Sequence, residues 1–349
     1  MKKQIATIAL LVTMSNVFAQ ESTAVPTTTF AGSADAYYKY DFSRVDNSLT
    51  SFTNSHNSFE LGMASIEASH KMGKASVFVD LGFGNRASQF TYNDKATTFM
   101  IKQLNFTYEF SDQFKVTAGS FATHIGYELM DAVDNKNYSM SYAFTYGPFF
   151  NTGIKAQYTA GKLSFMAGVT NPTDFKTALE AGSSQKTFIG QLAYLGDTGS
   201  LYLNATSGST NPSSDENKTQ FDVVGTKKIS DVFSLGFNGT YALTNNDIDS
   251  SLDGKWFSLV GYATIALKEN LSLAYRVEYL DAKDATPGLG SLSGTSVLGN
   301  TVSLNFKSGN LTVIPEIRFD KASEDIFTNS TAVPKGITAY ALLATTYTF

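Results

Sequence analysis

Segments with apolar residues at every second position recur along this chain, and the connections between them alternate strictly between short and long. A period of two is the pattern of a β-strand with one apolar face and one polar face. Each segment is roughly 9–13 residues long, which is enough for a tilted strand to cross a bilayer. Because a soluble sandwich has no reason to sort its connections by length, this alternation constrains the fold more than any other feature.

The connections divide into two sets. The short ones are residues 72–74, 111–113, 160–162, 196–199, 229–231, 268–270 and 307–310. The long ones, rich in Asn, Asp, Ser, Thr and Gly, are residues 43–57, 85–98, 122–150, 171–186, 207–218, 244–255, 281–296 and 321–337. Short periplasmic turns and long outer loops are typical of an outer-membrane barrel. The sequence therefore predicts an all-β fold, a transmembrane antiparallel β-barrel of about 16 strands with both ends in the periplasm.

Single strands show the alternation clearly. In the segment 337–349, one face carries Ala339, Ala341, Leu343, Tyr347 and Phe349, and the other carries Tyr340, Leu342, Ala344, Thr346 and Thr348. Two segments are irregular. Pro315 lies within an otherwise regular strand and removes a backbone donor, which predicts a bulge there or a different register. The segment from Phe59 to His70 changes parity midway, which predicts a β-bulge.

The N-terminus predicts export. Met1-Lys2-Lys3 is followed by an apolar run, and small residues precede Gln20, which indicates a signal peptide over residues 1–19. The chain has no cysteine, which excludes lipidation and disulfides. After residue 19 no apolar run approaches the ~20 residues of a membrane helix. We therefore expect residues 20–349 to form one barrel domain in the cell outer membrane, in contact with its lipid.

Composition and motifs argue against several functions. The formal net charge of −5 does not favour a nucleic-acid partner. The only histidines are His56, His70 and His124, and no nucleophile elbow accompanies them. Paired histidines with metal-ligand spacing are absent from the sequence as well. We expect no enzyme activity, no catalytic residues, no metal and no cofactor.

The longest outer loop, around residues 123–150, is the candidate for narrowing the barrel. It contains Ile125, Leu129, Met130, Val133 and Phe144, whereas the other long loops are nearly all polar. A loop folded against the inner wall would use these apolar side chains. The alternative is an outward loop or an adhesive tip.

This segment also carries a family resemblance. Gly126-Tyr127-Glu128 with Asp131-Ala132, then Asn137-Tyr138-Ser139, Phe144, Pro148 and Thr152-Gly153, resemble the OmpL-like β-barrel porins. The resemblance covers essentially the whole mature chain. It implies passive diffusion of small hydrophilic solutes through the barrel. The aromatic final residue Phe349 resembles the last residue of bacterial outer-membrane barrels in general, which implies recognition by the barrel-assembly machinery. Resemblance to 16-stranded porins implies that the protein could be a homotrimer.

Charged residues are the main candidates for determining which solutes and ions pass through the pore. The loop carries Tyr127, Glu128, Asp131, Asp134 and Lys136 as candidate constriction residues. The inward parity of the strands carries Lys39, Lys115, Lys155, Arg276 and Arg318 as candidate wall residues. If the loop crosses the lumen, acidic groups face basic groups across a narrow wet gap, and such charges set ion preference. The direction of that preference stays open, because the loop is mainly acidic and the wall mainly basic.

Two rival functions remain. A channel selective for sugars or amino acids could use the inward aromatic residues Tyr37, Trp256, Tyr262 and Tyr340 as a stacking path. A structural or adhesive barrel could instead bind a partner through its outer loops.

Overall fold

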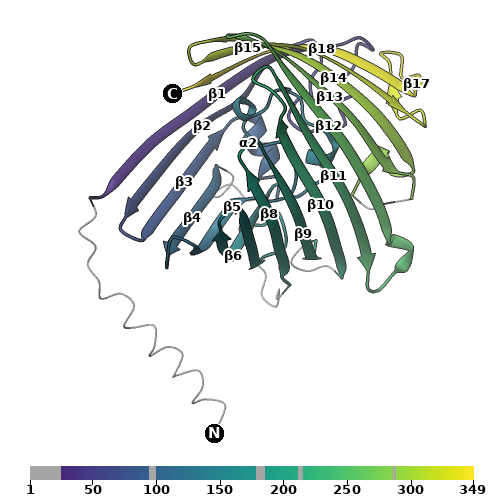
Figure 1. The fold of residues 1–349 in the computed structure, drawn as a ribbon. Helices are drawn as coiled ribbons and strands as arrows, with labels where there is room; N and C mark the ends of the chain where they lie inside the picture. The colour runs from purple at the N-terminus through teal and green to yellow at the C-terminus, as the bar shows by residue number, and fades with distance from the viewer. Residues whose placement is uncertain (1–24, 94–99, 178–184, 211–214, 285, 287) are drawn as a thin grey trace.

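The computed structural model describes residues 25–93, 100–177, 185–210, 215–284, 286 and 288–349. In these residues sixteen antiparallel strands form a closed barrel (Figure 1). The strands are β1 Thr27–Asp41, β2 Ser58–Met72, β3 Ala75–Phe83, β4 Ile101–Glu109, β5 Phe114–Ala122, β6 Phe150–Ala160, β7 Leu163–Thr170, β8 Thr187–Gly196, β9 Gly199–Ser209, β10 Glu216–Lys228, β11 Phe233–Asn246, β12 Gly254–Lys268, β13 Leu271–Ala282, β14 Thr295–Ser308, β15 Leu311–Ala322 and β18 Ile337–Thr348. The predicted fold class is confirmed.

The ring closes where the first and last barrel strands meet. β1 pairs with β18 over nine residues, from Ser33–Thr348 to Asp41–Tyr340. Phe349 extends the pairing, because its backbone N–H and C=O both bond to Gly32 at 3.0 Å. All other neighbours in the ring are consecutive barrel strands. The backbone hydrogen bonds therefore continue around the whole barrel, as lipid requires of a spanning sheet.

Connection lengths follow the predicted parity. The eight odd connections, beginning with the one between β1 and β2, are the long loops, and the seven even ones, such as the two residues between β2 and β3, are tight turns. We call the long loops L1 (42–57), L2 (84–100), L3 (123–149), L4 (171–186), L5 (210–215), L6 (247–253), L7 (283–294) and L8 (323–336). The predicted signal peptide 1–19, and residues 20–24 of the predicted domain, lie outside the described residues.

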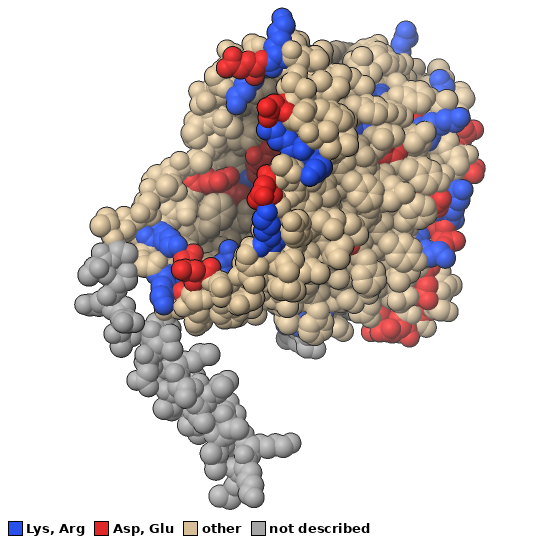
Figure 2. Space-filling view, in the orientation of Figure 1, with Lys and Arg blue, Asp and Glu red and all other residues tan. Residues whose placement is uncertain are grey.

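The two faces of the strands differ as the alternation predicts. Outward side chains such as Phe59, Leu61 and Ile154 are exposed, whereas inward ones such as Lys39 and Arg276 are buried. Figure 2 shows charged residues gathered toward the ends of the barrel and around a hollow, with a broad uncharged area between them. The outer surface is therefore suited to lipid.

Short elements lie in the loops. They are the helices α2 Asn85–Phe90 and α3 Tyr142–Thr145, the 3-10 turns η1 Ala132–Asp134, η2 Ser250–Leu252 and η3 Gly290–Leu292, and the hairpin of β16 Phe327–Thr328 and β17 Pro334–Lys335. In Figure 1, α2 lies within the ring of strands. Among the described residues, no helix has the length and apolarity of a membrane-spanning helix.

One predicted irregularity is present and the other is not. The register of β1 against β2 shifts where Asp35 pairs with Met63 and Ala36 with Leu61, which leaves Gly62 as the extra residue of a bulge. At Pro315 there is no bulge, because Ser303–Glu316 and Phe306–Val313 share one register. The ladder to β14 is only interrupted there, while Pro315 stays paired with Leu343 of β18. The prediction of a bulge or a different register at Pro315 was wrong.

We predict that Gly62→Ala destabilises the barrel. A Cβ at Gly62 would collide with the Asp35 carboxylate, which the bulge accommodates. Such overpacking should lower the free energy of unfolding by about 1–3 kcal/mol, measured by urea titration in detergent micelles. Gly225→Ala is the control, since its Cβ would meet nothing nearer than 3.9 Å. Equal stability of the two variants would contradict the role of the bulge.

Candidate functional site

L3 connects β5 to β6 and contacts the inner wall on opposite sides of the barrel. Glu128 is ion-paired with Arg276 of β13, and Asp131 is ion-paired with Lys102 of β4. In the ring, β13 and β4 are seven strands apart one way and nine the other. The segment between these two acidic residues therefore crosses the lumen.

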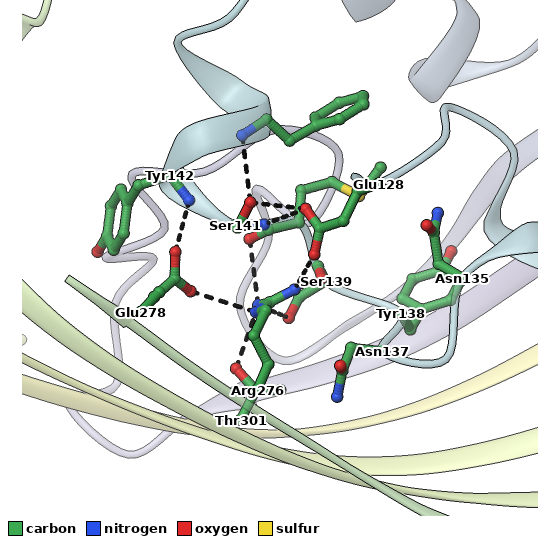
Figure 3. A network of polar contacts seen from close by, with 12 residues as sticks. Glu128, Asn135, Asn137, Tyr138, Ser139, Ser141, Tyr142, Arg276, Glu278 and Thr301 are labelled. Atoms are coloured by element: carbon green, nitrogen blue, oxygen red, sulfur yellow. Dashed lines mark hydrogen bonds and ion pairs between the residues drawn. The ribbon is translucent and has the colours of Figure 1, made fainter. Parts of the chain in front are cut away.

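The contact with β13 is a buried network (Figure 3). The Arg276 guanidinium lies 2.6 Å from Glu128 and 3.3 Å from Glu278, and it donates to Thr301 at 3.1 Å. It also donates to the backbone carbonyls of Ser139 and Met140 in L3. All these side chains are buried or nearly so. Because a buried charge is stable only when paired and hydrogen-bonded, Arg276 fixes L3 against this wall.

Neighbouring carboxylates hold the next residues of L3. Glu316 of β15 accepts hydrogen bonds from the backbone N–H groups of Tyr138 and Ser139, at 2.7 and 3.1 Å. Glu278 accepts from the N–H of Tyr142 at 2.7 Å, and the Tyr142 hydroxyl donates to Asp320 at 2.8 Å. Carboxylates of β13 and β15 thus accept hydrogen bonds from the backbone of L3.

The contact with β4 is also electrostatic. The Lys102 ammonium lies 2.9 Å from Asp80 and 2.8 Å from Asp131. With Glu67, these two aspartates form the one group of carboxylates, within the described residues, that is close enough to hold a metal ion. Lys102 already supplies the counter-charge there. We therefore interpret this cluster as an anchor for L3.

The first residues of L3 contact a third part of the wall. The N–H of Gly126 donates to Asp222 of β10 at 3.0 Å, and a ring nitrogen of His124 lies 3.0 Å from the Ala205 carbonyl of β9. Tyr127 stacks on Tyr262 of β12 with ring centroids 4.0 Å apart. L3 therefore touches β9, β10 and β12 as well.

L1 and L2 also fold inward. Phe52 of L1 and Phe90 of α2 pack with Phe144 and Phe149 of L3 in one buried cluster. Arg86 of α2 lies over the rings of Phe52 and Tyr138 and donates to the Met130 carbonyl of L3 at 3.2 Å. These contacts support L3 from the rim of the barrel that carries the long loops.

Two cavities lie on opposite sides of L3 along the same wall, β8 to β12. The outer cavity, about 510 Å³, is lined by loop residues together with Thr206, Lys218 and Gln220 of the wall. The inner cavity, about 460 Å³, is lined by L3 residues together with Asn204, Val224 and Thr264. Phe149 lines both cavities. On β10 the inward residues run Gln220, Asp222, Val224, so Asp222 lies at the level that divides them.

Polar side chains dominate this wall. Gln191, Asn204, Asn238 and Thr240 form a hydrogen-bonded chain around Asp222, across β8 to β11. The amide nitrogen and oxygen of Gln220 and the hydroxyl of Thr206 are buried without a protein partner. Buried polar atoms of this kind need water or a polar solute. The wall is therefore suited to a wet route past L3.

The residues predicted from sequence occupy different environments. Tyr127, Glu128, Asp131, Arg276 and Arg318 are engaged in the contacts that hold L3, Arg318 by donating to the Met140 carbonyl at 2.7 Å. The exposed side chains are Asp134, Lys136 and Lys115. The Lys155 ammonium lies 4.0 Å from the centre of the Phe121 ring, and Lys39 is buried with Asp46 of L1 at 2.8 Å.

This arrangement differs from the expected wet gap between an acidic loop and a basic wall. Glu128 and Arg276 meet directly and are both buried, because water between them would leave each charge less well compensated. Three of the four inward aromatic residues are likewise occupied, and the fourth, Trp256, lines the outer cavity. Tyr37 packs on Tyr138, Tyr262 stacks on Tyr127, and Lys39 lies over Tyr340. These three rings do not form an open stacking path for sugars.

Sequence reasoning missed Asp222, Lys102 and Arg86. Asp222 has inward parity in a clear strand, but only basic residues were assigned to the wall. Lys102 also lies on a regular strand, and nothing local identifies its partners. Arg86 lies in a segment predicted to be an outer loop.

Comparisons with known proteins agree with this geometry. A family model described as "Putative beta-barrel porin-2, OmpL-like" matches residues 27–349. No curated protein sequence matches the chain. The anion-selective porin from Comamonas acidovorans is similar in structure, with a TM-score of 0.64, 11% identity, and 93% of this chain and 100% of that chain covered. The channel DcaP of Acinetobacter baumannii has a TM-score of 0.60 and 12% identity, with 95% and 99% covered. At such identities the structures establish the fold alone.

We predict that Arg276→Leu releases L3. It would leave Glu128 buried without a cation, which should cost about 3–5 kcal/mol. Urea unfolding followed by the fluorescence of Trp256, the one tryptophan, would measure this, since Trp256 packs in the same buried cluster as Tyr142.

The matched control is Thr301→Val, which removes a single hydrogen bond to the same guanidinium. We expect it to cost about 1 kcal/mol. If Arg276→Leu were no more destabilising than this control, the ion pair would not be what holds L3.

Proposed function

Since this chain belongs to the OmpL-like family of β-barrel porins and is an outer-membrane porin, we propose that small hydrophilic solutes diffuse passively past L3 along β8 to β12. The observation that carries this proposal is the pair of cavities on either side of L3, which share one polar wall. The polar groups of such a wall can replace the hydrogen bonds that a hydrophilic solute makes with water, so the wall suits solutes of this kind.

The constriction in this proposal is where the first residues of L3 approach the wall. Gly126 and His124 contact β10 and β9 there, and Phe149 borders both cavities. A moderate displacement of these residues would join the cavities. Glu128, Asp131, Arg276 and Arg318 act in this scheme by positioning L3. Asp134, Lys136, Lys115 and Lys155 contribute charge to the lumen.

Diffusion is driven by the solute gradient, so the proposed mechanism includes no chemical step and no cofactor. The family and the fold point to a channel, and we propose that the protein has no enzymatic activity. We further propose that residues 1–19 are removed on export. The outward apolar residues would face membrane lipid. Phe349 and β18 would be recognised by the barrel-assembly machinery, and the assembled protein would be a homotrimer.

The test is single-channel conductance in a planar lipid bilayer, with and without residues 127–143. Deletion of this part of L3 removes the crossing segment and its anchors to β13 and β4. We expect a larger conductance from the deletion variant than from the intact protein, because a wider aqueous section carries more current.

A deletion of residues 248–252 in L6 is the control. These residues are exposed, and none of them lines either cavity. We expect the control to conduct like the intact protein. If folded intact protein and both variants passed no current, the channel proposal would fail. An L3 deletion without effect would reject L3 as the constriction.

A further inference from the structure

Asp222 differs from most other buried charges of the lumen. Its carboxylate accepts hydrogen bonds only from neutral donors, which are Gly126 of L3, Asn204, Asn238 and Thr240. No ion pair within the described part of the chain includes Asp222. By contrast, Glu128, Asp131 and Asp320 each have a cationic partner. The negative charge of Asp222 is therefore solvated by dipoles and not cancelled.

The position of this charge gives it influence over transport. Asp222 lies between the outer and the inner cavity on the inward face of β10, and it holds the first residues of L3. Its side chain is 1% exposed, so ions would not bind to it. A charge in a wall of low dielectric acts at a distance, however, and a narrow section concentrates its field.

Charges around the cavities have the same sign on balance. Asp174 and Glu216 line the outer cavity against Lys218, and Asp134 opposes Lys136 in the inner cavity. Burial raises the pKa of Asp174 to about 6, so it is ionised in mildly alkaline solution. Two opposing charges lie outside both linings, Lys155 within electrostatic range of His124, and Lys115 within electrostatic range of Lys155. The two linings together with Asp222 therefore carry a net negative charge at the level of L3.

We propose that Asp222 sets the ion preference of the pore, so that it favours small cations and amine-bearing solutes over anions. This inference rests on the proposed function, because it assumes that solutes pass between L3 and β10. It also specifies the charge of the preferred solutes, which the sequence alone does not decide.

The test is the reversal potential of purified protein in a planar bilayer under a KCl gradient at about pH 8, where an ordinary histidine is uncharged. A unit negative charge that acts through water on an ion ~8 Å away attracts K⁺ and repels Cl⁻, which should make K⁺ roughly fivefold more permeant than Cl⁻. Asp222→Asn should bring this ratio close to one. Asp222→Glu keeps the charge while changing the geometry, and it should retain the cation preference.

Two further variants serve as controls. Glu316→Gln neutralises another buried carboxylate that binds L3 without a cation, but Glu316 lies on β15, away from the wall of β8 to β12 that borders both cavities. We expect it to leave the ratio unchanged. Lys155→Gln should raise the cation preference by removing one opposing charge.

The outcomes separate this inference from the channel proposal. An anion preference in the intact protein would overturn it, and so would a ratio that Asp222→Asn and Glu316→Gln change equally. Loss of selectivity in Asp222→Glu as well as in Asp222→Asn would attribute the effect to geometry and reject the role of charge. Absence of any current from folded protein would defeat the channel itself.

Discussion

Backbone hydrogen bonding in lipid is the constraint on which this structure depends. A strand that crosses the hydrocarbon must satisfy every N–H and C=O within the protein, so a sheet in the membrane has to close. The pairing of β1 with β18, extended by Gly32 and Phe349, removes the last free edge. Once the ring is closed, outward residues meet lipid and inward residues meet water or protein. The arrangement of L3 follows from this, because any loop inside the ring must satisfy its own polar groups there.

L3 meets that requirement with charged and polar residues of the wall. Carboxylates of β13 and β15 accept its backbone N–H groups, and arginines of the same strands bind its carbonyls. The direction of these contacts matters. They concentrate on β13 to β15, with a smaller anchor on β4, and leave the cavities beside β8 to β12. The loop therefore divides the lumen unequally, and the space left for solutes lies to one side.

Local periodicity was enough to predict the barrel but not its interior. Strand parity depends on neighbouring residues, so the sixteen strands, the sorted connections and the bulge near Gly62 could be predicted. Glu128 and Arg276 are 148 residues apart, and no local pattern relates them. The inward folding of L1 and L2 was missed for the same reason, because Phe52 and Phe90 are buried by residues distant in sequence, such as Phe144 and Phe149 of L3. Asp222 could have been predicted as a lumen residue, because its parity in the strand is clear from the sequence. Only its lack of a cationic partner requires the structure.

The closing contact between β1 and β18 also bears on how the barrel is made. It joins residues that are 299 to 315 positions apart, from Asp41 with Tyr340 to Ser33 with Thr348. Contacts of such high sequence separation form slowly, because the chain must lose conformational entropy before the free energy of the contact is gained. Until β18 has been synthesised, β1 keeps an unpaired edge that is prone to aggregate. Without β18, both β1 and β15 would keep a free edge, so the chain depends on being kept apart from other chains until its final strand is in place.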